Sequence, residues 1–193
     1  MKKVIIALLI ALIIPCCVFA GRGLFDFTIG VAAQSDYDVQ KVKEEGMKDF
    51  SIDQLAFGAD VEMKLAFAAI DGKVMYAPES KSISGIISAN LALDIFFLRV
   101  KAGLGYEYQY NLETKQFIYG NAMDIQDFDN FKDANFDITA GVDILLGNLT
   151  VGAYASLPTN VSITKGNWDE LLSTAKEGWD QAKLGMVIGI SLI

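Results

Sequence analysis

The residues of this chain that could do chemistry are mostly carboxylates. The sequence has no His, and its two cysteines, Cys16 and Cys17, both lie near the N-terminus. Ser-His and Cys-His catalysis and the usual zinc ligand sets are therefore excluded. Asp60 and Glu62 stand two residues apart, and acids so close can raise one another's pKa for acid and base work. Neutralisation by bases is the favoured interpretation, with these candidates: Lys64, Lys73, Arg99 and Lys101.

A second group of oxygen ligands could gather around Ca²⁺ in a polar stretch late in the chain. Its members are Asp124, Asp127, Asp129, Asn130 and Asp133. The spacing and the turn glycine of a calcium-binding loop are missing, so a solvated acidic loop is the favoured interpretation. The glycines form no phosphate-binding fingerprint. We therefore expect no catalytic residue, no metal and no cofactor, and we expect that the protein is not an enzyme.

The first twenty residues have the pattern of a secretory signal peptide. It begins with the basic residues Lys2 and Lys3, followed by an apolar core at 4–14 and the helix breaker Pro15. Val18 and Ala20 then form a small-residue cleavage site before Gly21. The apolar core is too short for a membrane anchor. We expect a signal peptide at 1–20 and one domain at 21–193.

A lipoprotein signal, with Cys16 or Cys17 lipidated, is the alternative for this segment. Pro15 or Cys16 would then precede the cleavage, where a small residue such as Gly, Ala or Ser is usual. Lipidation would add an anchor and leave the fold unchanged. Cleavage after Ala20 would leave no cysteine, so an exported chain needs another source of stability, such as a closed hydrogen-bonded barrel.

The net charge is acidic. It is −8 for the whole sequence and falls near −10 when Lys2 and Lys3 leave with the signal. Nucleic acids bind to basic surface patches, so a nucleic acid is not an expected partner of this acidic chain. After the signal, no apolar run is long enough for a membrane helix of about 20 residues.

Apolar and polar residues alternate with period two in eight segments, which is the pattern of β-strands with two different faces. The segments are 22–34, 54–64, 68–76, 83–95, 98–110, 136–144, 149–157 and 183–193. The last one runs to the end of the chain, where an uncovered apolar edge would invite aggregation. Pairing of the last strand with the first would remove both edges.

The phase of the alternation switches inside two apolar stretches, near 65–67 and 95–97, and Leu146, Gly147 and Asn148 give a third short turn. A one-residue slip moves every side chain to the opposite face, so each switch predicts a very short turn. Longer connections follow the first, fifth and seventh strands, and the one after the fifth, 111–134, is expected to be irregular. Pro158 is expected to end the seventh strand. This arrangement predicts an eight-stranded antiparallel up-and-down transmembrane β-barrel with a short helix in the last long loop.

The two faces differ in charge. Outside the rims, the apolar face has no Asp, Glu, Lys or Arg, which favours lipid because hydrocarbon penalises a basic residue by about 2 to 4 kcal/mol. The opposite face would fill a narrow lumen with ion pairs among Arg22, Asp26, Asp60, Glu62, Lys64, Asp71, Lys73, Asp94, Arg99, Lys101, Glu107, Asp137, Asp143 and Lys183. The alternative is a soluble, secreted, lipocalin-like barrel that binds lipid inside.

The mature chain resembles the small outer-membrane β-barrel family, which includes OmpX-like, OmpW-like and OmpA transmembrane-domain-like barrels. The resemblance rests on the architecture and on the terminal strand. It implies outer-membrane lipid and the assembly machinery as partners. The family's assembly signal usually ends in Phe, Tyr or Trp, whereas this chain ends in Ile193, with the apolar alternation displaced onto Leu192. We expect no appended peptidoglycan-binding domain, and histidine-dependent barrel enzymes are excluded.

The favoured function is a structural or surface-interaction role in the outer membrane, with loops that meet host or envelope partners. A passive, porin-like conduit for small hydrophobic molecules is the alternative that the OmpW-like resemblance implies. In that alternative, a candidate entrance helix, capped by Asn167 with Glu170, would shield an opening. Its apolar side consists of Trp168, Leu171, Leu172, Ala175 and Trp179.

Overall fold

The structure is a computed structural model that describes residues 23–35, 52–119, 134–162, 165–171, 173, 179 and 182–193. Its nine strands are β1 (Phe25–Ser35), β2 (Leu55–Leu65), β3 (Ala68–Ala77), β4 (Ser82–Ile95), β5 (Leu98–Asn111), β6 (Gln116–Tyr119), β7 (Asn135–Leu146), β8 (Leu149–Ser162) and β9 (Lys183–Ser191). Two short 3-10 helices, η2 (Ile52–Gln54) and η4 (Trp168–Glu170), complete the described elements. The predicted signal peptide lies outside these residues.

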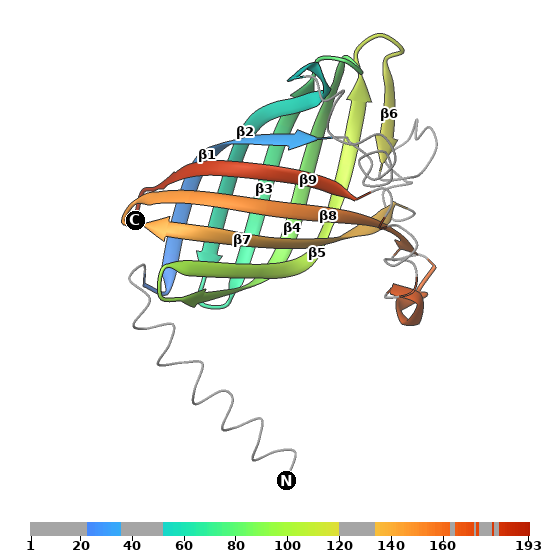
Figure 1. Cartoon of the computed structure of the whole chain (residues 1–193). Helices are drawn as coiled ribbons and strands as arrows, with labels where there is room; N and C mark the ends of the chain where they lie inside the picture. Colours follow the sequence, from blue (N-terminus) through green and yellow to red (C-terminus); the bar gives the residue numbers. More distant parts are fainter. Residues whose placement is uncertain are drawn as a thin grey trace.

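Eight of the strands close into an antiparallel barrel, which confirms the predicted fold class (Figure 1). The strand order is β4-β3-β2-β1-β9-β8-β7-β5, and β4 also pairs with β5. The last strand pairs with the first from Thr28 opposite Ser191 to Ser35 opposite Leu184. The edge left by the end of the chain is therefore covered, as closure requires.

The three predicted short turns are confirmed by the register of their hairpins. In each, two residues separate the last pair of partners: Leu65 with Ala68, Ile95 with Leu98, and Leu146 with Leu149. The first central residue has a positive φ in all three, 54° at Ala66, 56° at Phe96 and 60° at Gly147. Two-residue hairpins need this geometry because it matches the twist of the strands.

Side chains alternate between the two surfaces of the barrel wall. Among the described residues of the eight barrel strands, every exposed side chain is apolar or aromatic, from Phe25 in β1 to Ile190 in β9. The interior holds the buried charged residues, together with Ser, Thr and small apolar side chains. The orientation is the reverse of that in a soluble barrel, whose apolar side chains fill the core.

Two predictions about the connections are wrong. The stretch after β5, expected to be irregular, contains β6, which pairs with the far end of β5 from Tyr108 to Asn111. Pro158 does not end its strand, because β8 continues to Ser162. The register of β7 and β8 shifts between Asn135 and Asp137, beside Pro158, so the missing amide hydrogen falls where the ladder is already irregular.

No helix in the described part of the chain is long and apolar enough to cross a membrane.

Candidate functional site

Arg99 is the centre of an ion-pair network inside the barrel. It is the second residue of β5, directly after a short turn, and its side chain is fully buried. Its guanidinium donates to Asp26 of β1 at 2.7 Å, to Glu62 of β2 at 2.5 Å and to Asp94 of β4 at 2.7 Å. A planar guanidinium with five donors can satisfy three carboxylates at once.

Three lysines extend the network around the wall. Lys64 pairs with Asp94 at 2.8 Å. Lys101 reaches two carboxylates from opposite sides of the barrel, Glu62 at 2.5 Å and Asp143 of β7 at 2.9 Å. Deeper in the barrel, Lys73 pairs with Asp60 at 3.1 Å and with Asp71 on its own strand.

The network comprises six carboxylates and four cations from β1, β2, β3, β4, β5 and β7, with a separation of 3.8 Å between Lys101 and Asp71 where the Lys73 group meets the rest. Buried charges need several partners each, because a single ion pair does not offset the loss of water. A hydroxyl contributes at the seam of the barrel, where Ser191 donates to Asp26 at 2.5 Å. The result is a polar plug with members from seven of the eight barrel strands, β1, β2, β3, β4, β5, β7 and β9.

The remaining predicted lumen charges lie nearer the long connections. Lys183 pairs with Glu107 at 2.6 Å, and Ser156 donates to Asp137 at 3.1 Å. Asp137 and Glu107 are buried, whereas the side chain of Lys183 is 29% exposed. Arg22 lies outside the described residues.

Tyr154 is an interior residue that the sequence analysis did not single out. Its hydroxyl donates to Gln34 at 2.9 Å, and the Nζ of Lys73 lies 4.5 Å from the centre of its ring. The ring packs against a small apolar cluster, which consists of Ala32, Ala56, Met75, Ala77, Ile86 and Val187. Gly185 is the residue opposite Tyr154 in β9, and a Cβ there would collide with the ring. A tyrosine facing a glycine across the polar face is the signal that could have identified it.

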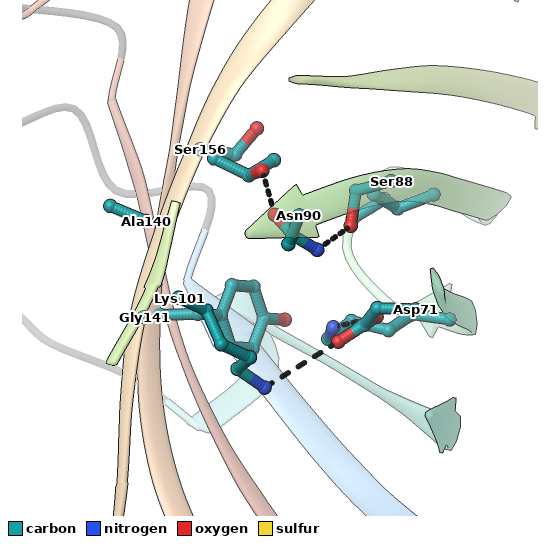
Figure 2. Close-up of a pocket in the computed structure, with 11 residues that line it drawn as sticks. Asp71, Ser88, Asn90, Lys101, Ala140, Gly141 and Ser156 are labelled. Carbon is teal, nitrogen blue, oxygen red and sulfur yellow. Dashed lines mark hydrogen bonds and ion pairs between the residues drawn. The ribbon is translucent and has the colours of Figure 1, made fainter. Parts of the chain in front are cut away.

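A small cavity remains within the filled interior, between the plug and Tyr154. Its volume is about 20 Å³. Its lining includes the charged, hydroxyl and amide groups of Asp71, Lys73, Lys101, Ser88, Asn90, Thr139 and Ser156, beside Ile86, Ala140, Gly141 and Tyr154. Figure 2 shows Ser88, Asn90 and Asp71 on one side of this space, with Lys101 beside Gly141 on the other.

The candidate entrance helix is only partly described, because Leu172 and Ala175 lie outside the described residues. Trp168 belongs to η4 and packs on Phe136, with ring centres 5.1 Å apart, and Phe136 packs on Tyr106 at 4.3 Å. Tyr106 stands opposite the exposed Ile87, which places this aromatic ladder on the outer side of the wall. Trp179 is 49% exposed and Leu171 half-buried.

The expected capping of this segment by Asn167 is not observed. The side chain of Asn167 makes no capping hydrogen bond to the helix backbone. Its amide donates instead to the carboxylate of Glu170 at 2.8 Å. The segment therefore starts as a short 3-10 turn rather than as a capped α-helix.

Asp60 and Glu62, the acids considered for catalysis, have separate cation partners, Lys73 for the first and Arg99 and Lys101 for the second. Among the described residues, no group of three or more His, Cys, Asp and Glu side chains could hold a metal ion. The acids from Asp124 to Asp133 lie outside those residues. The absence of an enzymatic activity stays a prediction.

An exposed ion pair ties two connections together at the far end of the barrel. Lys81, between β3 and β4, pairs with Glu113, between β5 and β6. The amide of Leu112 also donates to the carbonyl of Lys81 at 2.9 Å. The carboxylate of Glu113 raises the pKa of Lys81 because its hydrogen bond and its charge both favour the ammonium form.

The fold and its interior define a class: a closed eight-stranded antiparallel β-barrel with a lumen filled by buried salt bridges. No model of a known family, no curated protein and no solved structure matches the chain. The resemblance to small outer-membrane barrels therefore stays a prediction.

Proposed function

We propose that this protein is an integral outer-membrane β-barrel with a closed lumen, whose exposed loops serve a structural or surface-interaction role. One observation carries the proposal: the exposed side chains of the described barrel strands are apolar, while the charges are buried inside. A wall of this kind suits hydrocarbon and not water.

The same orientation argues against a soluble lipid-binding barrel. A lipid ligand would need an apolar cavity large enough to hold it, whereas charged groups line or fill most of the described interior and its small cavity has Asp71, Lys73 and Lys101 in its wall. The plug also argues against free passage of solutes, because Arg99 and Lys101 cross the lumen to reach β1 and β2. A closed barrel therefore favours a structural or surface-interaction role of the exposed loops.

A charge placed on the wall tests the membrane setting. Ile188 of β9 is 51% exposed on the outside, and Ile188→Lys should destabilise the barrel in lipid vesicles by about 2 to 4 kcal/mol. Leu112→Lys is the matched control, since Leu112 is 43% exposed in the turn between β5 and β6. Urea unfolding, followed by heat-dependent gel mobility, measures both. Equal stability of the two variants, or a wild-type chain that stays monomeric without detergent, would contradict the proposal.

Conductance of the purified chain in planar bilayers tests the closed lumen. The wild-type barrel should show no sustained current and no uptake of small solutes into vesicles. Uptake of apolar solutes would instead favour the conduit, whose support in the structure is the apolar cluster beside Tyr154. Surface proteolysis of intact cells should cut the long connections and leave the strands intact.

A further inference from the structure

The cavity beside the plug has the size and lining of a hydration site. A site for one water needs about 10 to 15 Å³ of space and two to four polar partners. The cavity provides about 20 Å³, and its polar groups come from β3, β4, β5, β7 and β8. Its volume and its polar groups therefore suit a bound water.

The spacing of one charged pair in the cavity wall points in the same direction. Nζ of Lys101 and Oδ2 of Asp71 are 3.8 Å apart, which is too long for a direct hydrogen bond (Figure 2). Both side chains are largely buried, at 12% and 4% exposure. Two polar groups more than 3.5 Å apart at the wall of a cavity can be bridged by a water.

The donors and acceptors also fit. The ammonium of Lys101 has three protons, and Glu62 and Asp143 lie at 2.5 Å and 2.9 Å from it. A third proton can be donated towards the cavity. Oδ1 of Asp71 accepts from Lys73, so Oδ2 is the oxygen on the side of Lys101.

We propose that this cavity is a binding site for a single water molecule, which accepts from Lys101, donates to Asp71 and contacts the hydroxyl of Ser88. Ser88 stands directly opposite Asp71 in the β3–β4 ladder and lines the cavity. The water is an internal member of the plug, and it joins the charged network to the hydroxyl and amide groups of β4 and β7. The proposal does not depend on whether the barrel spans a membrane.

A crystal structure of the folded chain at a resolution that shows ordered water tests the site. The expected result is one density peak within hydrogen-bond distance of both Lys101 Nζ and Asp71 Oδ2. A direct ion pair between these atoms, with the cavity closed, would overturn the proposal.

A pair of matched variants locates the water. Ser88→Val places an apolar side chain in the cavity wall and should remove the peak. Ser84→Val makes the same change on the same strand, at a buried residue that does not line the cavity, and should keep it. Heat-dependent gel mobility checks that both variants fold. A peak that persists in Ser88→Val, or that is lost in both folded variants, would overturn the assignment.

Discussion

The half of the lumen near the short turns and the half near the long connections are filled by different means. Near the turns, Arg99 alone joins carboxylates from three other strands. Near the connections, Tyr154 fills the space with a ring that rests on Gly185 and an apolar cluster that includes Met75 and Ile86. One half is held by charge pairing and the other mostly by packing.

This difference teaches where the barrel tolerates change. A buried cation with three carboxylate partners leaves uncompensated charge when a neutral residue replaces it. A packed ring can be shortened at the cost of the contacts that it loses. Lys183 tests this distinction, because it is a cation in the packed half with a partly exposed side chain.

The largest expected effect comes from the charged half. Arg99→Gln leaves Asp26, Glu62 and Asp94 without their shared cation and should lower the free energy of unfolding by about 3 to 5 kcal/mol. Lys183→Gln, the control in the other half, should cost about 1 kcal/mol or less because solvent screens its partly exposed pair. Urea unfolding of the folded barrel measures both. Similar losses for the two variants would show that the halves do not differ in this way.

A smaller effect is expected from the packed half. Tyr154→Ala should cost about 2 to 3 kcal/mol, below the value for a fully buried aromatic residue because the ring is half-buried. Tyr154→Phe keeps the ring, loses the hydrogen bond to Gln34 and should cost about 1 kcal/mol. The same unfolding assay applies. If Tyr154→Phe costs as much as Tyr154→Ala, the hydroxyl and not the packing holds this half together.

Substitutions in two of the short turns beside the charged half should change the free energy of unfolding in opposite directions. Ala66 and Gly147 occupy equivalent turn positions with φ values of 54° and 60°. Ala66→Gly should stabilise the barrel and Gly147→Ala should destabilise it, each by about 1 kcal/mol or less, because only glycine adopts a positive φ without strain. Differences in urea midpoint measure the pair. Changes of the same sign would mean that backbone strain is not what separates these turns.

The smallest effect belongs to the exposed pair beyond the packed half. The raised pKa of Lys81 means that its pairing with Glu113 stabilises the fold below the unfolded lysine pKa of about 10.4 and is lost as the pH rises through the higher folded value. Glu113→Gln should shift the NMR titration of the Lys81 side chain to lower pH. Added salt should reduce the shift, and an unchanged titration would mean that the pair does not form in solution.

Alternation in the sequence was enough to predict the eight strands, their closure and the three short turns. The alternation depends only on residues that are close in the sequence. Charged residues such as Asp60, Glu62 and Lys64 mark the polar side of their strand. The switch of phase at Ala66 directly predicts the turn between β2 and β3.

The pairing of charges could not be predicted in the same way. Arg99 meets Asp26 and Glu62 only because the closed barrel and its register place β1 and β2 across from β5. Likewise β6 depends on β5 extending beyond its partner β7, and the continuation of β8 past Pro158 depends on a register shift that alternation does not reveal.

The order in which the strands can meet follows from the seam between β1 and β9. The hairpins β2–β3, β4–β5 and β7–β8 need only the closing of two-residue loops, whereas the seam joins the two ends of the domain and has the largest loop-closure entropy to overcome. Asp94 and Arg99 can therefore meet early within one hairpin, while Asp26 reaches Arg99 and Ser191 only when the ring closes. We expect Asp26→Asn to accelerate unfolding with little change in the folding rate. The Asp26 carboxylate would then slow the opening of the closed barrel without helping it to form.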